Sequence, residues 1–159
     1  MKFLLAIFIL ITTAFGDISF KETRYISAVD MERDLYGSFK FIDDHMVISY
    51  IRPAIQTITY LNDSMSIKNK DGEISTYSYA EYPQARYMSM LLKAIINDQY
   101  ESIAEIFTIT KQTNMIRLDA KSSISSTISS INIKKENSTL NSILINMTNK
   151  DTIKIEITN

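Results

Sequence analysis

The sequence predicts a mainly β protein of the α+β class, in which an antiparallel sheet carries a helical cover. Segments with alternating apolar and polar residues recur along the 159-residue chain, and turn residues separate them. Residues 83–107 interrupt this alternation and follow a helical period. Strands joined by short turns pair in an antiparallel manner, and the apolar face that they share has to be covered.

The first 16 residues have the pattern of a secretory signal peptide. Lys2 supplies a positive charge, residues 3–11 form an unbroken apolar run, and Ala14 and Gly16 place small residues at a cleavage site. The alternative is a membrane anchor, but the apolar run is shorter than the ~20 residues that a helix needs to span a bilayer. We therefore expect cleavage near Gly16, export, and a single domain at residues 17–159.

The composition excludes several classes of function. The chain is 45% hydrophobic and 22% charged, as in an ordinary globular domain. It has no cysteine, which removes disulfides, thiolate metal sites and thiol nucleophiles. Loss of Lys2 with the leader leaves 16 basic and 18 acidic residues, a net charge of −2. That balance argues against nucleic acid as a partner.

The mature chain begins with one weakly patterned segment, followed by three clear strands. Residues 17–28 predict a short helical start that runs into a strand, and residues 29–34 predict a polar hairpin connection. Residues 35–61 then predict three consecutive strands, with Asp43–Asp44 as one turn and Arg52–Pro53 as the end of the middle strand. Their shared apolar face consists of Leu35, Gly37, Phe39, Phe41, Met46, Ile48, Tyr50, Ile58 and Tyr60.

A further hairpin precedes the helical region. Residues 64–70 place Met65 and Ile67 on one face, and the pair Asp71–Gly72 is the strongest hairpin signal in the chain. Residues 73–79 alternate as the returning strand.

Two helices are predicted next. Pro83 fits a first helical turn, and the helix is expected over residues 83–96. Its apolar stripe consists of Tyr87, Met88, Leu91, Leu92 and Ile95. A second, shorter amphipathic helix is expected over residues 98–107.

Strand patterns resume after the helices. Segments 107–111 and 115–121 are joined at Thr113–Asn114, and segments 130–136, 139–148 and 151–158 form the last three strands. The serine-rich residues 121–130 resemble a flexible linker, but regularly spaced isoleucines keep this segment attached to a core. The total is about ten strands and two helices.

Several short motifs in a fixed order resemble one family. They are F-x-E-T from Phe20, G-S-F-K-F from Gly37, S-Y-x-x-P from Ser49, D-G at Asp71, P-x7-L-L from Pro83, F-T-I from Phe107 and R-L-D from Arg117. Together, over residues 17–159, they resemble the periplasmic outer-membrane lipoprotein carrier family, the LolA-like proteins. The resemblance implies an incomplete, strongly curved antiparallel β-barrel with helices covering its open face.

The resemblance also implies a function. Such a protein is a periplasmic carrier that shields the acyl chains of a lipoprotein, or a related lipid, between an inner-membrane donor complex and an outer-membrane acceptor. It would be a monomer without catalytic residues, metal or cofactor. The residues expected to line its hydrophobic cavity are Phe39, Phe41, Met46, Ile48, Tyr50, Ile58, Tyr60, Met65, Ile67, Tyr87, Met88, Leu91, Leu92 and Ile95.

One position departs from the family. Carriers of this kind have an arginine that helps to hold the helical lid, and alignment on Tyr50 and Pro53 places Val47 at that position. Arg52 lies nearby with the wrong parity. The closed lid is therefore expected to depend on apolar contacts.

The alternatives to a carrier are an enzyme and a protein-interaction module. An enzyme is not expected, because the single histidine, His45, lies at a hairpin tip beside two aspartates, no G-x-S-x-G elbow is present, and no acidic residue is expected inside an apolar strand face. The second is a protein-interaction module of a cell-envelope export or glycolipid pathway, with its concave face packed shut. Acyl species that co-purify with the protein would distinguish the carrier from this module.

Overall fold

The first and last strands of the described residues pair with each other in the middle of one curved sheet. The computed structural model describes residues 16–158. All of the predicted leader except Gly16 therefore lies outside the described residues. Eleven antiparallel strands have the order β6-β5-β4-β3-β2-β1-β11-β10-β9-β8-β7. Within each half of the sheet consecutive strands pair with each other, and the pairing of β1 with β11 joins the two halves. The chain therefore crosses from one edge strand, β6, to the other, β7, through the helical region.

The strands in the first half are β1 (Ile18–Ile26), β2 (Met31–Ile42), β3 (His45–Arg52), β4 (Gln56–Tyr60), β5 (Ser64–Asn69) and β6 (Ile74–Ser78). Those in the second half are β7 (Phe107–Lys111), β8 (Met115–Ala120), β9 (Ile128–Glu136), β10 (Thr139–Met147) and β11 (Thr152–Ile157). Between the halves lie the α-helix α1 (Pro83–Ile96) and a short 3-10 helix, η1 (Tyr100–Ile103).

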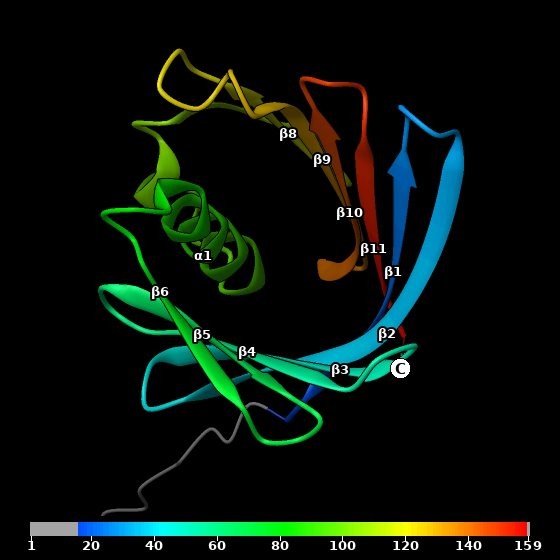
Figure 1. Cartoon of the computed structure of the whole chain (residues 1–159). Coiled ribbons are helices and arrows are strands. Elements are labelled where there is room, and N and C mark those ends of the chain that lie inside the picture. Colours follow the sequence, from blue (N-terminus) through cyan, green and yellow to red (C-terminus); the bar gives the residue numbers. More distant parts are fainter. Residues whose placement is uncertain (1–15, 159) are drawn as a thin grey trace, which may run out of the picture.

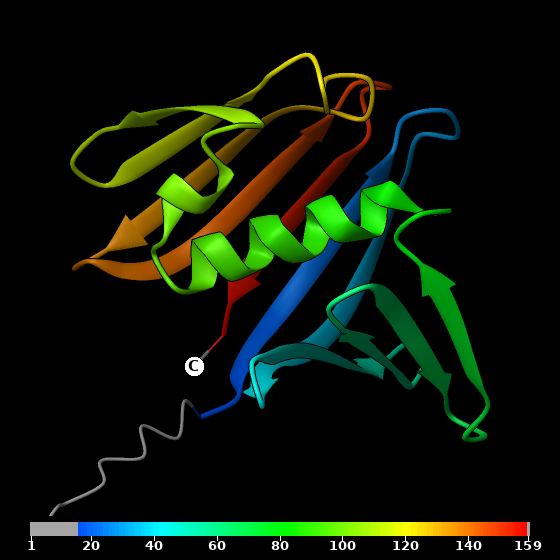
Figure 2. The same ribbon diagram turned by 90° about the vertical axis from the view of Figure 1, so that its left-hand side faces the viewer.

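The sheet curves around a central space and does not close into a barrel, since β6 and β7 remain its two edges. Figure 1 shows α1 in the gap between the two halves of the sheet. In the view turned by 90°, α1 runs across the open side (Figure 2). Buried residues of α1, among them Leu91 and Ile95, belong to the same hydrophobic cluster as buried residues of the sheet. No helix within residues 16–158 is long and apolar enough to cross a membrane.

The prediction for the first strand and the connection after it was wrong. Residues 18–26 are extended throughout, without a helical start, and residues 31–34 belong to β2 and not to a connection. The turn is short because Asp30 adopts a positive φ of 50°, a conformation that aspartate tolerates. Pairing with β1, from Ile26 with Met31 to Ile18 with Phe39, extends the polar residues of β2 into a strand.

The second predicted helix was also wrong in extent. Of residues 98–107 only Tyr100–Ile103 are helical, and Phe107 already begins β7. Asp98 adopts a positive φ of 57° directly after α1, which ends the helix. The predicted helix at 83–96 is confirmed, with Pro83 in its first turn.

An aromatic cluster forms the floor of the concave side. The rings of Phe20 and Phe39 stack with centroids 4.3 Å apart, and Tyr50 meets Phe20 edge-on at 5.7 Å. Both phenylalanines are almost fully buried. The cluster connects β1, β2 and β3, so it fixes the three central strands on which the candidate site is built.

Gly37 marks a close approach between β2 and β3. A β-carbon at this position would collide with the backbone carbonyl oxygen of Ser49 and would lie 3.0 Å from Cζ of Phe20. The register of the two strands shifts between Tyr36 and Gly37. Glycine inside a strand is typical of such a site.

Gly37→Ala is therefore expected to lower the free energy of unfolding by about 1–3 kcal/mol, because the strands must move apart to admit the methyl group. Urea denaturation measures the effect. Ser75→Ala, at an exposed position in the edge strand β6, is the control, because it puts alanine into a strand where no close contact has to give way. Equal effects of the two substitutions would contradict the close approach.

Candidate ligand cavity

A cavity of about 200 Å³ lies between the concave face of the sheet and α1. Its lining comes from both halves of the sheet and from the helix, and it is mostly apolar. The lining residues are Glu22, Arg24, Phe39, Ile48, Tyr50, Ile58, Tyr60, Met88, Leu92, Ile145, Ile153 and Ile155.

Half of the residues predicted for the cavity line it. These are Phe39, Ile48, Tyr50, Ile58, Tyr60, Met88 and Leu92. Of the rest, Met46, Leu91 and Ile95 are packed in the core, while Phe41 and Met65 are partly buried against it. Ile67 is half-buried on β5, and Tyr87 lines a different groove. Strand alternation identifies the face of each residue, but it does not locate the space that side chains leave unfilled.

A second, outer groove of about 330 Å³ adjoins α1. It lies between the first half of α1, residues 123–128 and the end of β10. Its lining includes Tyr87, Ile124 and Met147. Met88 lines both this groove and the inner cavity. A flexible thioether side chain therefore separates the two spaces, and methionine repacks at low cost.

The lining also contains a buried acidic residue, which the sequence pattern did not predict. Glu22 is 3% exposed, between Phe20 and Arg24 on the concave side of β1. The Tyr50 hydroxyl donates a hydrogen bond to Glu22 Oε2 at 2.6 Å. Arg24 Nε donates to the other carboxylate oxygen and forms an ion pair with it. The expectation of no acidic residue in an apolar face is thus wrong.

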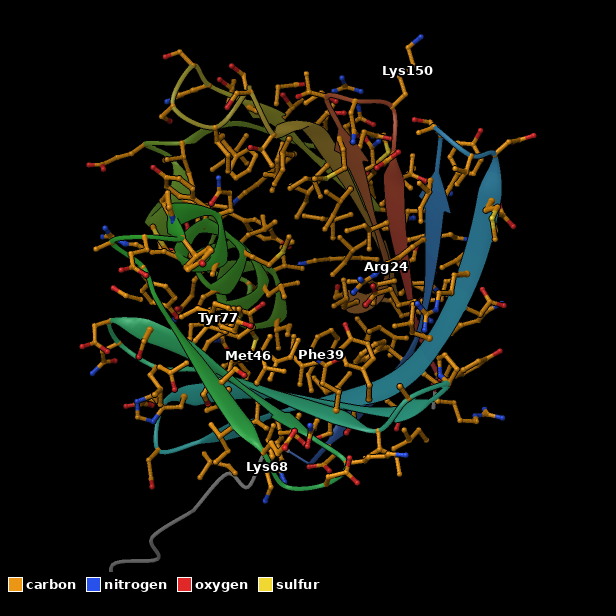
Figure 3. The ribbon with its side chains drawn as sticks, viewed as in Figure 1. Arg24, Phe39, Met46, Lys68, Tyr77 and Lys150 are labelled. Atoms are coloured by element: carbon orange, nitrogen blue, oxygen red, sulfur yellow. The ribbon has the colours of Figure 1, made fainter. Side chains whose placement is uncertain are left out.

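Arg24 brings a positive charge to the cavity from β1. Figure 3 shows its side chain extending from the sheet into the enclosed space. Val47, which aligns with the family arginine, does not line the cavity. The alternation that places Phe20, Glu22 and Arg24 on one face could have revealed this cluster, but residues 17–28 were predicted to begin as a helix.

Burial and charge shift the titration of the cluster. Burial, followed by the Glu22 carboxylate, raises the pKa of Tyr50 far above its ordinary value. Burial, with smaller effects of Tyr79 and Glu22, raises the pKa of Tyr60 to about 12. Burial alone lowers the pKa of Arg24, but Glu22 raises it, and the net shift is upward. The guanidinium therefore stays charged inside an apolar lining.

The shifted tyrosines make stability sensitive to alkaline pH. An unfolded tyrosine ionises near pH ~10, so above that pH the unfolded state loses protons before the folded state does. Stability should then fall by at most about 1.4 kcal/mol per pH unit for each buried tyrosine. For Tyr60 the loss runs up to its folded pKa of about 12.

Tyr50→Phe removes one ionisable group from this set. Urea denaturation between pH ~8 and ~12 should show a shallower alkaline decline in the free energy of unfolding for this variant than for the unsubstituted chain. The same slope in both proteins would contradict the assigned burial of the Tyr50 hydroxyl.

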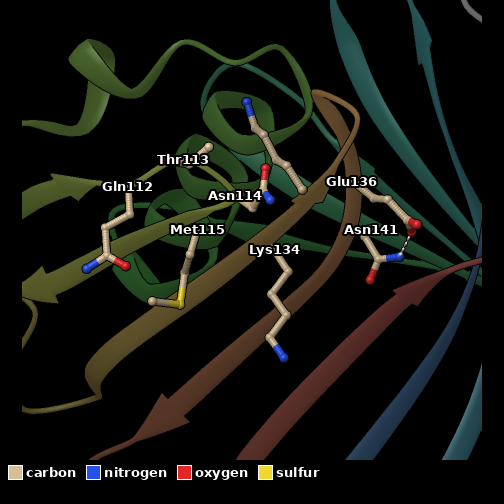
Figure 4. Close-up of a pocket in the computed structure, with 8 residues that line it drawn as sticks. Gln112, Thr113, Asn114, Met115, Lys134, Glu136 and Asn141 are labelled. Atoms are coloured by element: carbon tan, nitrogen blue, oxygen red, sulfur yellow. Dashed lines mark hydrogen bonds between the residues drawn. The ribbon is translucent and has the colours of Figure 1, made fainter.

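A larger surface concavity, of about 570 Å³, has different chemistry. It lies where the β7–β8 turn faces β9 and the start of β10 (Figure 4), and polar or charged side chains line most of it. There Asn141 Nδ2 donates a hydrogen bond to Glu136 Oε2 at 3.3 Å. This lining does not suit an apolar chain. Within residues 16–158, no cluster of three histidine or acidic side chains could hold a metal ion.

Comparisons with known proteins leave the function open. No protein-family model and no curated protein matches the chain. A crystal structure of a DUF1329 family protein from Desulfovibrio piger ATCC 29098 is similar over 90% of this chain and 83% of that chain. The sequence identity is 10% and the TM-score is 0.42. The function therefore has to be argued from the cavity itself.

Proposed function

We propose that this protein is a periplasmic carrier that holds an acyl chain of a lipoprotein, or of a related lipid, inside the curved sheet. The observation that carries the proposal is the pair of apolar spaces on either side of Met88. The inner cavity is lined mainly by isoleucines, aromatic rings and Leu92, and the outer groove beside the first half of α1 shares Met88 with it. An inner-membrane donor, an outer-membrane acceptor, a monomeric state and export by a cleaved leader belong to the same proposal.

The volumes of the two spaces show that binding of a long acyl chain requires a conformational change. Ligand pockets usually measure ~300–1,000 Å³, so an inner cavity of about 200 Å³ is too small for a long chain. Rotation of Met88, or displacement of α1, would join it to the outer groove of about 330 Å³. Each methylene group buried there contributes about 0.8 kcal/mol, which offsets the cost of opening.

The contacts of α1 are of the kind that a lid requires. Its buried positions include Leu91, Leu92 and Ile95. None of the ion pairs found among residues 16–158 involves α1. Apolar contacts are little affected by salt, so ionic strength should not change the protection of α1 against hydrogen exchange.

A second candidate function is a protein-interaction module with a closed interior. Its support is the dense core, in which Met46 and Leu91 are both 0% exposed, together with the small volume of the cavity. The edge strand β6 also exposes Ile74, as a strand that receives a partner would. In this module the cavity is a packing defect and holds no ligand.

Ile58→Trp tests the carrier directly, because Ile58 lines the cavity from β4 and is only partly buried. The larger ring should fill the space and exclude at least two methylene groups, which lowers the affinity for a fluorescent fatty acid about tenfold. Ile74→Trp, at an exposed position on β6, is the matched control and should bind as the parent does.

Fluorescence titration of delipidated protein measures this affinity, and mass spectrometry of an organic extract identifies co-purified lipid. Acyl species in the extract together with weaker binding by Ile58→Trp are the expected results. An empty extract and no binding by the parent would overturn the carrier and favour the interaction module.

A further inference from the structure

We propose that Arg24 receives the anionic head group of the carried amphiphile, so the ligand is a chain that ends in a carboxylate or a phosphate. The inference rests on the proposed carriage of an acyl chain and names the class of lipid. Its starting point is the Glu22–Arg24–Tyr50 cluster, which is the charged part of an otherwise apolar lining.

Stability does not explain this cluster. The carboxylate of Glu22 loses its hydration on burial, and an apolar replacement of a buried ion pair is often as stable as the pair. The surrounding lining includes Ile48, Ile153 and Ile155, which an apolar pair could extend. We therefore expect the charged pair to have a role in binding a ligand and not only in stabilising the fold.

Arg24 has donor capacity to spare. Its Nε–H donates the hydrogen bond to Glu22 Oε1. A guanidinium carries five N–H donors in all, so further donors remain for a ligand. Its side chain is 45% exposed whereas that of Glu22 is 4% exposed. Arg24 thus lies toward the open end of the cavity, where a head group would remain while the chain occupies the interior.

The charge around Arg24 favours an anion. Arg33 lies directly opposite Arg24 in the β1–β2 register, so both side chains are on the same face of the sheet. Like charges at such positions are destabilising. On the other side the partner of Arg24 is Ile153. Arg33 does not line the cavity, but its position opposite Arg24 adds positive charge to this part of the face, which an anionic head group would offset.

The test compares ligands that share one chain. Delipidated protein is loaded with a neutral fluorescent acyl probe, and dodecanoic acid, dodecyl phosphate and methyl dodecanoate are used to displace it. Charge-assisted hydrogen bonds are about twice as strong as neutral ones, so the acid or the phosphate should displace the probe at about tenfold lower concentration than the ester. The order of acid and phosphate shows which head group the site prefers.

Three variants separate the head-group site from the folding role of the ion pair. Glu22→Gln keeps the hydrogen-bonding shape and removes the competing carboxylate, so it should increase the preference for the anion. The double variant Glu22→Gln, Arg24→Met leaves no unpaired buried charge and should bind acid and ester equally. Arg117→Met is the matched control, because Arg117 pairs with Asp119 and does not line the cavity.

The outcomes distinguish the head-group site from the carrier function. An anion preference that rises with Glu22→Gln and disappears in the double variant supports the inference. Equal displacement by acid and ester in the parent, or a preference that survives in the double variant, overturns it while the carrier function stands. Failure of the parent to bind the probe or any of the three chains overturns the carrier function itself.

Discussion

Arg24→Ala is expected to lower the free energy of unfolding by about 3 kcal/mol, because it leaves the buried Glu22 carboxylate without its counter-ion. The Tyr50 hydroxyl at 2.6 Å remains as a hydrogen-bond donor to that carboxylate, but it carries no positive charge. Breaking a fully buried pair costs up to about 5 kcal/mol, but Arg24 is partly exposed, so water can reach the vacated space. Urea denaturation at neutral pH measures the change.

Two controls define this result. Arg117→Ala removes an exposed arginine whose partner, Asp119, is also exposed to water, and it should cost no more than about 1 kcal/mol. Glu22→Gln together with Arg24→Met should recover much of the stability that Arg24→Ala loses. A cost for Arg24→Ala similar to that of Arg117→Ala would show that the Glu22 pair is not buried as described.

Phe20→Ala is expected to be the most destabilising single substitution, at about 3–5 kcal/mol. The ring is 1% exposed, stacks on Phe39 and meets the edge of Tyr50. Its removal leaves a void beside Gly37, which has no side chain of its own to fill the space. The loss should appear as a lower midpoint of urea denaturation.

Tyr82→Ala provides the aromatic comparison. Tyr82 is 47% exposed and contacts Tyr77 edge-on near the start of α1, so its removal should cost no more than about 1 kcal/mol. If the two substitutions cost the same, the ring of Phe20 would not be part of the structural core.

Local patterns in the sequence predicted much of the fold. Pro83 and the spacing from Tyr87 to Ile95 predicted α1, because proline in a first turn and an apolar stripe depend only on neighbouring residues. The alternation of Met46, Ile48 and Tyr50 predicted the buried face of β3. These features need no knowledge of the distant partner strand.

Features that depend on long-range pairing were missed. Residues 31–34 are polar and became a strand only through pairing with β1. Glu22 was missed because no acidic residue was expected in an apolar face, where a carboxylate is unfavourable until Arg24 and Tyr50 are placed beside it. Tyr50 comes from β3, 28 positions along the chain, so the spacing in sequence gives no sign of the contact.

The location of a bound acyl chain tests the central claim most directly. Delipidated protein is mixed with a fatty acid that carries a photoactivatable diazirine at the end of its chain, irradiated, and digested for mass spectrometry. The account predicts cross-links to residues of the inner cavity, such as Ile48, Ile58 and Leu92, and their loss in Ile58→Trp. Cross-links confined to exposed residues, such as Ile74 on β6, or their absence, would contradict it.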